Sequence, residues 1–250
     1  MTGGVGTDTT KAVGIPRYPP FPCQLDSIPA LWGAVGGLLG HTPIICGGIN
    51  PQDGNRDQAS NQCHRLIKPS TLTILPRLQV GRAFAASAVV ANESLLWVTG
   101  GSSLVAQNDS HPLDSIEAGA THPLDSTEFV DVQYGTSMAG PRLPQPLLFH
   151  CLIQLNPDQV LLVGGLNDRG EPEDKTYLFD YPSRTWTEGP PLNYERYGQA
   201  CGSFYMETSR GHFELVALVV GGRNFRNLKW ARTPVEHINM IRDQKWSLGK

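Results

Sequence analysis

Short apolar runs that end in two glycines recur four times along the chain. The runs TPIICGG, LLWVTGG, VLLVGG and ALVVGG close at Gly47-Gly48, Gly100-Gly101, Gly164-Gly165 and Gly221-Gly222. A short continuous apolar run stopped by glycine is typical of a strand buried on both faces and followed by a turn with positive φ. The pattern therefore predicts four buried strands, each followed by a tight turn.

The spacing of these runs indicates a repeat. The first glycines lie 53, 64 and 57 residues apart. The longest interval contains a tandem copy, HPLDSIEAGAT at 111–121 followed by HPLDSTEFV from 122, and removing its eleven residues restores the shorter period. A period in the fifties favours a propeller or a solenoid. We interpret 102–124 as an extended loop that carries the insertion.

Other segments keep step with the glycines. Within each repeat the pattern predicts four strands in order: an opening strand, the Gly-Gly strand, a third strand such as TYLFDYP after a variable loop, and a fourth strand near a Trp position. The expected blades are about 32–81, 82–146, 147–195 and 196–250, preceded by a flexible Gly- and Pro-rich leader at 1–31. Residues 235–246 also have apolar residues at helical spacing, but the repeat register favours strands there.

This arrangement resembles kelch repeats. The resemblance covers residues 32–250 and rests on the Gly-Gly pairs, the aromatic-acidic third strands, and Trp186 and Trp246 after the Gly-Gly pairs. It implies an all-β, kelch-type β-propeller with four four-stranded blades. Kelch propellers usually have six blades, sometimes five or seven. Four repeats leave three readings open: a closed four-bladed ring, an open or partial ring from an incomplete product, or association with another chain through open propeller edges.

The charge composition of the chain indicates which classes of partner are improbable. Charged residues make up 17% of the chain and the net charge is −3, so no basic field is available for a phosphate backbone or an anionic bilayer. We therefore expect neither a nucleic acid nor a membrane as partner. No apolar run is long enough to span a bilayer and the N-terminus does not resemble an export signal, which leans towards a cytoplasmic location without deciding it.

Cysteine usage and glycosylation motifs also bear on the compartment. The five Cys include no C-x-x-C spacing, which argues against a zinc site and a disulfide scaffold, so we expect free thiols, with one or two disulfides as the alternative. Two N-x-S motifs occur, at Asn92 and Asn108. Roughly one would arise by chance, so they do not decide the compartment.

The sequence offers little catalytic chemistry. The seven His are scattered and no G-x-S-x-G motif occurs, so we expect no catalytic residue, no metal and no cofactor. His150 and Cys151 are neighbours in an expected strand and would point to opposite faces. Galactose oxidase has a similar propeller architecture and requires a Cys joined to a Tyr beside copper. Cys201 and Tyr205 lie close in sequence, but no His cluster accompanies them.

Recognition is the remaining function. The kelch resemblance implies a non-catalytic module that binds an unidentified protein partner through loops before the opening strands and after the Gly-Gly pairs. Those loops contain Arg82, His150, Arg196 and Tyr197, and Asn167, Asp168, Arg169, Arg223 and Asn224. Arg and Tyr are frequent at interface hot spots. The alternative is a secreted carbohydrate-binding or copper-oxidase-like propeller, which a Cys46–Cys63 disulfide or a glycan on Asn92 would favour.

Several of these residues have structural alternatives. Arg82 and Arg196 could pair with carboxylates of adjacent blades, and 167–170 could be a simple turn. If the two arginines contact a partner, Arg82→Ala with Arg196→Ala weakens binding without unfolding the domain. A melting temperature lowered by many degrees would assign both to the structure.

Overall fold

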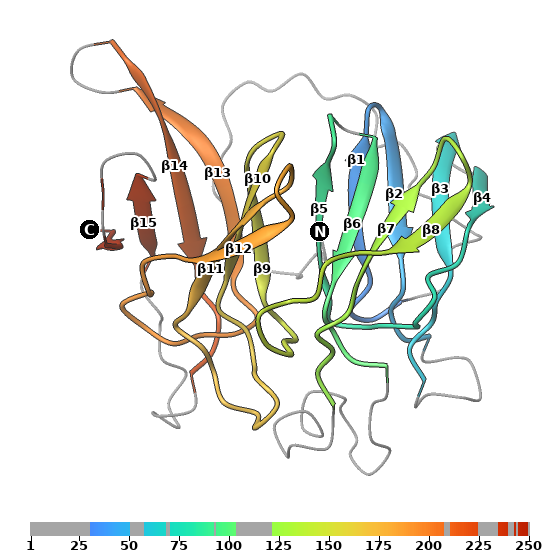
Figure 1. The fold of residues 1–250 in the computed structure, drawn as a ribbon, viewed down its shortest axis with the longest axis horizontal. Coiled ribbons are helices and arrows are strands. Elements are labelled where there is room, and N and C mark those ends of the chain that lie inside the picture. The colour runs from blue at the N-terminus through green and yellow to red at the C-terminus, as the bar shows by residue number, and fades with distance from the viewer. Residues whose placement is uncertain are drawn as a thin grey trace, which may run out of the picture.

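The computed structural model describes residues 31–50, 58–68, 71–92, 94–103, 122–207, 211–224, 235–239, 243 and 245–249. Within these ranges every regular element is a β-strand, and the strands form four antiparallel sheets of four strands each. The sheets are arranged as the blades of a four-bladed β-propeller (Figure 1). The expected all-β propeller is therefore confirmed. No helix within the described ranges is long and apolar enough to cross a membrane.

Each blade is a meander whose strands pair in chain order. Blade 1 contains β1 (Val35–Leu39), β2 (Thr42–Cys46), β3 (Cys63–Lys68) and β4 (Thr71–Leu75). Blade 2 contains β5 (Ala86–Val90), β6 (Leu95–Thr99), β7 (Thr127–Asp131) and β8 (Thr136–Ala139). Blade 3 contains β9 (Cys151–Asn156), β10 (Gln159–Val163), β11 (Thr176–Asp180) and β12 (Thr185–Glu188). Blade 4 contains β13 (Ala200–Glu207), β14 (Phe213–Val220), β15 (Glu236–Asn239) and β16 (Ser247–Leu248).

The second strands show where each blade is covered. All five residues of β6 are buried, and four of the five in β10, because blades 2 and 3 each have a neighbour on both faces. The apolar runs of β2 and β14 are only partly buried. Blades 1 and 4 are the terminal blades, and among the described strands each packs against one neighbouring blade only. The prediction of a strand buried on both faces is thus correct for the two middle blades.

Two tryptophans pack between blades as the resemblance implied. The Trp186 ring lies 5.7 Å from the Trp97 ring of blade 2, measured between centroids, and its indole N–H donates to the carbonyl of Arg142 at 2.9 Å. Trp246 is buried in the cluster between blades 3 and 4, and its N–H donates to the carbonyl of Pro190. Both rings therefore combine apolar burial with a satisfied polar atom.

The glycine pairs form the joints between successive blades. The N–H of Gly101 donates to the carbonyl of Leu147 in blade 3, with an N···O distance of 2.9 Å. A Cβ atom on Gly100 would lie 2.4 Å from that same oxygen, closer than any side chain tolerates. Equivalent bonds join Gly48 to Arg82 and Gly165 to Arg196. The close approach of the next blade therefore requires glycine at these positions.

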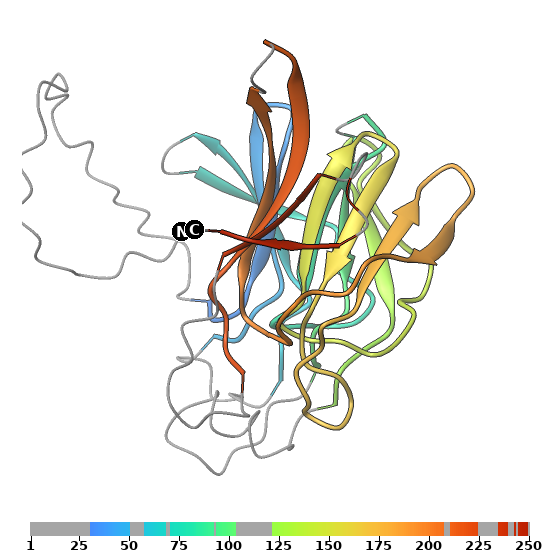
Figure 2. The same ribbon diagram turned by 90° about the vertical axis from the view of Figure 1, so that its left-hand side faces the viewer.

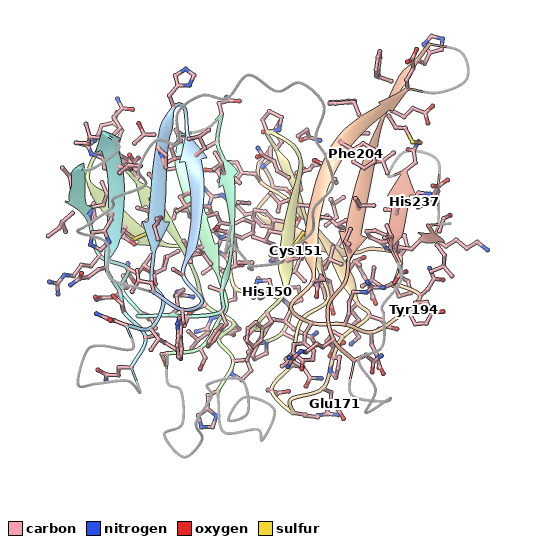
Figure 3. The ribbon with its side chains drawn as sticks, turned by 180° about the vertical axis from the view of Figure 1, so that it is seen from behind. His150, Cys151, Glu171, Tyr194, Phe204 and His237 are labelled. Atoms are coloured by element: carbon pink, nitrogen blue, oxygen red, sulfur yellow. A yellow bond between two sulfur atoms is a disulfide. The ribbon has the colours of Figure 1, made fainter. Side chains whose placement is uncertain are left out.

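The propeller is open between its terminal blades. β1 packs against β5, β5 against β9, and β9 against β13, but no comparable packing joins β13 to β1 among the described residues. No described atom lies within 4 Å of a Cβ placed on Gly221, the fourth counterpart of Gly100. Apolar side chains are exposed on both terminal blades, including Leu38 on β1 and Phe204 on β13, the latter labelled in Figure 3.

Two disulfides correct the expectation of free thiols. Cys46 and Cys63 are register partners on β2 and β3, and they are bonded to each other. A disulfide between Cys151 and Cys201 joins β9 and β13, the first strands of blades 3 and 4. The second pair is separated by 50 residues in sequence, about one repeat. Adjacent blades place such distant positions side by side, and a motif search for short Cys spacings does not detect that proximity.

Several expectations lie wholly or largely outside the described residues. They are the leader at 1–31, the loop insertion at 102–124, the fifth cysteine at Cys23 and the second glycosylation motif at Asn108. Within the ambiguous stretch 235–246, the described β15 is a strand paired with β14, as the repeat register indicated.

Candidate binding site at the loop end

The two ends of the blades differ in the length of their connections. At one end, here called the loop end, the second and third strands of each blade are joined through residues 47–62, 100–126, 164–175 and 221–235. The linkers between blades meet these loops at the same end, through bridges such as Leu148 with Leu166 and Tyr197 with Arg223. The first and second strands are joined at the opposite end by much shorter connections, at 40–41, 91–94, 157–158 and 208–212. Figures 1 and 2 show the described loop between β10 and β11, residues 164–175, below the strands.

Arg82 lies in the linker that enters blade 2, and its side chain is fully buried. One terminal nitrogen donates to the carbonyls of Gly100 (2.9 Å) and Ser126 (2.8 Å). The other lies 2.7 Å from Oε1 of Glu128 on β7. Burial lowers the pKa of the Arg82 guanidinium and the charge of Glu128 opposes that shift. Because guanidinium remains protonated in proteins, this is a buried ion pair.

Arg196 repeats this arrangement in blade 4. Its guanidinium pairs with the carboxylate of Glu236 on β15, both side chains are fully buried, and the other terminal nitrogen donates to the carbonyl of Gly221. Neither arginine is positioned to meet a partner at the surface. The structure favours the carboxylate-pairing alternative, with one difference: each arginine pairs with a carboxylate of its own blade rather than of the adjacent one, since linker and third strand converge at the loop end.

The two glutamates also anchor the linkers. Glu128 accepts hydrogen bonds from the backbone N–H groups of Gln79 (2.5 Å) and Val80 (3.1 Å). Glu236 accepts from the backbone N–H of Asn193, at 2.7 Å, and from its side-chain amide. Each carboxylate thus satisfies linker donors and an arginine at once. An unpaired buried donor would otherwise cost about 1–3 kcal/mol.

In blade 3 uncharged residues occupy the positions of the arginine and the glutamate. Leu147 is equivalent to the arginines because its carbonyl accepts the hydrogen bond from the preceding glycine pair, and Tyr177 is equivalent to the glutamates by its strand register. Both belong to one apolar cluster with Leu143 and Leu162. Burial, together with the nearby carboxylates of Glu188 and Glu173, raises the pKa of Tyr177, so its phenol stays neutral. The position equivalent to Gln79 and Asn193 is Pro144, which has no N–H to satisfy.

His150 is buried between blades 2 and 3. Its Nε2 lies 2.7 Å from the Thr99 hydroxyl of the preceding blade, and its Nδ1 has no hydrogen-bond partner in the described residues. Complete burial lowers the pKa of His150 to about 3, so the ring is neutral at physiological pH. Cys151 is consumed in the disulfide to Cys201 (Figure 3). This pair therefore offers no nucleophile and base, and His150 is a packing residue rather than a surface contact.

A series of backbone hydrogen bonds crosses the loop end from blade to blade. The N–H of Phe84 donates to the carbonyl of Gly33, that of Phe149 to Phe84, and that of Gly198 to Phe149. Phe84 and Phe149 have φ of 57° and 54°, a region that costs non-glycine residues roughly 1–2 kcal/mol. Their rings lie 4.6 Å apart, and Tyr197 lies 5.9 Å from Phe149. Tyr197 is almost fully buried and belongs to this aromatic packing.

The exposed candidates lie in the loop between β10 and β11. Asn167 folds this loop: its Oδ1 accepts from the N–H groups of Arg169 (2.9 Å) and Glu171 (3.0 Å), and its Nδ2 donates to Glu173 (2.8 Å). The turn interpretation therefore holds for Asn167. The side chains of Asp168 and Arg169 are exposed on the turn, near Glu171 at the tip of the loop end in Figure 3.

Arg223 and Asn224 are partly buried beside the linker that enters blade 4. Arg223 forms two backbone hydrogen bonds with Tyr197, and the Asn224 amide donates to the carbonyl of Glu195 at 3.0 Å. The nine candidate residues thus gather at one end of the molecule, but they divide into two groups. Arg82, His150, Arg196 and Tyr197 form its buried base, while Asp168 and Arg169 are exposed and Asn167, Arg223 and Asn224 are intermediate.

Sequence reasoning missed Glu128 and Glu236. Both occupy the third-strand position that pairs with the residue two before the first glycine, Val98 and Val219 respectively. Aligning the third strands on the glycine pairs would have brought out this shared position.

Two features of the described residues concern redox and metal chemistry. The sulfur of Cys201 is bonded to Cys151, so it is not available for the Tyr linkage that an oxidase of the galactose oxidase type requires. Within the described residues, no group of three or more His, Cys, Asp or Glu side chains is placed to hold a metal ion.

Comparison with known proteins identifies a fold neighbour. No protein-family model matches the chain, and no curated protein matches its sequence. The solved structure of YjhT, a β-propeller, is similar, with a TM-score of 0.66 and 16% sequence identity over 87% of this chain and 70% of that one. At this identity the likeness concerns the fold.

Proposed function

We propose that this chain is a non-catalytic binding module of kelch type that recognises a protein partner with its loop end. The observation that carries the proposal is the difference between the two ends: the four long connections between second and third strands all start and finish at one end, and short connections join the first two strands at the other. Long loops on a rigid scaffold are the usual place for recognition. The glycine pairs and the two tryptophan positions support the kelch assignment.

The loop end has a rigid base and an exposed tip. The buried pairs Arg82–Glu128 and Arg196–Glu236 fix the linkers from which the loops project. Asp168, Arg169 and Glu171 supply exposed charges of both signs. Preorganised loops lose less entropy on binding, and mixed charges suit a protein surface of complementary charge rather than a uniformly charged polymer.

The two disulfides assign the module to an oxidising compartment in this proposal. Such bonds persist outside the cytosol and are rare inside it. This replaces the lean towards a cytoplasmic location, and it meets one criterion set for the secreted alternative. The disulfides do not support copper-oxidase chemistry, because Cys201 is paired with Cys151. A secreted, non-catalytic binding module agrees both with the presence of two disulfides and with the pairing of Cys201.

The test is a paired set of surface variants. Asp168→Ser with Arg169→Ser removes two exposed side chains at the loop end and leaves the Asn167 turn intact. The control is Tyr134→Ser, an exposed residue in the short turn between β7 and β8 at the opposite end. A partner is first captured with the full, oxidised chain and identified by mass spectrometry. Its affinity is then measured for each purified variant.

We expect the loop-end variant to bind at least tenfold more weakly, and Tyr134→Ser to bind like the parent. Tenfold corresponds to about 1.4 kcal/mol, a typical contribution for one interface contact. Equal affinity for both variants, or a selective loss in the Tyr134 variant, would contradict a partner site at this loop. Thermal melts of each variant confirm that both remain folded.

A further inference from the structure

The turn between β5 and β6 carries one of the two Asn-x-Ser motifs in a described position. β5 ends at Val90 and β6 begins at Leu95, which are register partners, so Ala91, Asn92 and Ser94 lie at the tip of a hairpin. Asn92 is exposed at this tip. The tip lies at the end of the blades away from the long loops (Figure 1). A sequon at an exposed turn is the structural setting in which N-glycosylation is accommodated.

The hairpin does not use the Asn92 carboxamide to hold its shape. Ser94 supplies the turn contacts, because its backbone N–H and its hydroxyl both donate to the carbonyl of Ala91, at 3.2 and 2.6 Å. Asn side chains in turns usually bond to nearby backbone, as Asn156 and Asn167 do here. In the described residues, the carboxamide of Asn92 has no such bond. Modification of its Nδ2 therefore breaks no hydrogen bond within the described part of the chain.

The backbone of this turn also suits Asn. Ala91 and Asn92 both have positive φ, 54° and 53°. Asn is one of the few non-glycine residues that adopts this region readily. The conformation returns the chain directly into β6, and the Asn92 side chain is exposed there.

From these observations and the two disulfides we propose that Asn92 is an acceptor site for an N-linked glycan. The co-reactant is an oligosaccharide linked to a lipid pyrophosphate, in the oxidising compartment where the disulfides form. The Nδ2 atom of Asn92 bonds to C1 of the first sugar and the C1–O bond to the pyrophosphate breaks. The lipid pyrophosphate leaves with the electron pair, and the amide loses one proton.

The position of Asn92 separates the glycan from recognition. A glycan there extends from the end opposite the loop end, away from Asp168 and Arg169, so it leaves the proposed partner site uncovered. This inference goes beyond the binding function and does not depend on which partner is bound. It does require the oxidising compartment.

The experiment uses the full chain, directed into the secretory pathway of mammalian cells by a cleavable leader. Disulfide-bonded monomer is isolated from the medium and from the endoplasmic reticulum. Peptides are then treated with an amidase that removes N-glycans in heavy-oxygen water, which labels each formerly occupied Asn. The variants are Asn92→Gln and Ser94→Ala. The matched control is Ser110→Ala, which removes the second motif at Asn108 and leaves the first intact.

We expect label on Asn92 in the parent and in Ser110→Ala, and none at this position in Asn92→Gln or Ser94→Ala. We also expect glycosylated and enzymatically deglycosylated protein to melt within a few degrees of each other and to bind a captured partner equally. Unmodified Asn92 in the disulfide-bonded monomer from both fractions overturns the proposal. Occupied Asn92 found only in aggregated protein overturns it as well, because the folded hairpin would then not tolerate the glycan.

Discussion

In blade 2 the linker before the first strand, β5, is held by the buried Arg82–Glu128 pair. In blade 3 Leu147 and Tyr177 occupy the equivalent positions. The backbone around both sites is alike: each linker residue accepts the hydrogen bond of the preceding glycine pair through its carbonyl. The same joint is therefore built once with charges and once with apolar contacts. The fold requires that the joint be filled and its polar groups satisfied, and it does not prescribe the chemistry.

The exchange of residues is coupled across three positions. Glu128 accepts from the linker N–H groups of Gln79 and Val80, and Pro144 in blade 3 removes the first of these two donors. Breaking a buried ion pair is expensive because the remaining charge is left without a partner, while replacing the whole pair by well-packed apolar groups is often neutral. Blades 2 and 3 therefore make this general rule testable within one chain.

The largest effect is expected from breaking a pair on one side only. Arg196→Leu leaves the Glu236 carboxylate buried without its cation and should lower the free energy of unfolding by about 3–5 kcal/mol. Urea unfolding followed by tryptophan fluorescence measures this loss. The control is Arg142→Leu at the exposed Arg142–Asp125 pair, whose arginine side chain is 77% exposed, and it should cost less than about 1 kcal/mol. Similar losses for the two variants would remove the distinction between buried and exposed pairs.

A smaller effect, dependent on pH, distinguishes blade 3 from blade 4. His150 in blade 3 and Gln199 in blade 4 occupy equivalent positions, and the side chain of each forms a hydrogen bond to the preceding blade. The pKa of His150 is about 3 in the folded chain and 6.5 is its usual value. Between these values the unfolded chain binds a proton that the folded chain does not, so stability falls as pH falls, by about 1.4 kcal/mol per pH unit. The loss should reach about 2 kcal/mol at pH 5.

His150→Gln places the blade 4 residue in blade 3 and should remove that part of the pH dependence. Unfolding free energies at pH 7.5 and pH 5 for parent and variant measure the difference. The control is His64→Gln: burial also lowers the pKa of His64, but that ring is only partly buried, so the His150 contribution should persist in this variant. An unchanged loss at pH 5 in His150→Gln would show that His150 is not the group responsible.

The smallest effect is expected when all three blade 2 residues are replaced together by their blade 3 counterparts. Gln79→Pro, Arg82→Leu and Glu128→Tyr together convert the blade 2 joint to the residues of blade 3. The triple variant should unfold within about 1–2 kcal/mol of the parent, since no buried charge and no Gln79 N–H remains, and the residual cost comes from the Val80 N–H, which loses its Glu128 acceptor. Arg82→Leu alone serves as the comparison and should be less stable than the triple variant. If the triple variant is the less stable of the two, the joints are not interchangeable.

The periodic features of the fold were predictable because they depend on local pattern. Apolar runs followed by Gly-Gly marked the four second strands, and the third strands of blades 2 and 3 were found at TEFVD and TYLFD. The candidate site was predictable only in part. Arg82 and Arg196 were correctly placed at the loop end, but their burial was not evident, since Glu128 is 46 residues from Arg82 and Glu236 is 40 from Arg196.

The sequence by itself predicted the strands, the repeat and four blade-forming repeats in this chain, because strand period, glycine turns and repeat spacing are properties of neighbouring residues. Only the tertiary structure decided which cysteines are bonded, which charges are buried, and which candidates are exposed, as Asp168 and Arg169 are. These depend on how equivalent positions of different repeats meet across a blade or between blades. Burial, and with it the cost of leaving a charge unpaired, is set by those distant contacts.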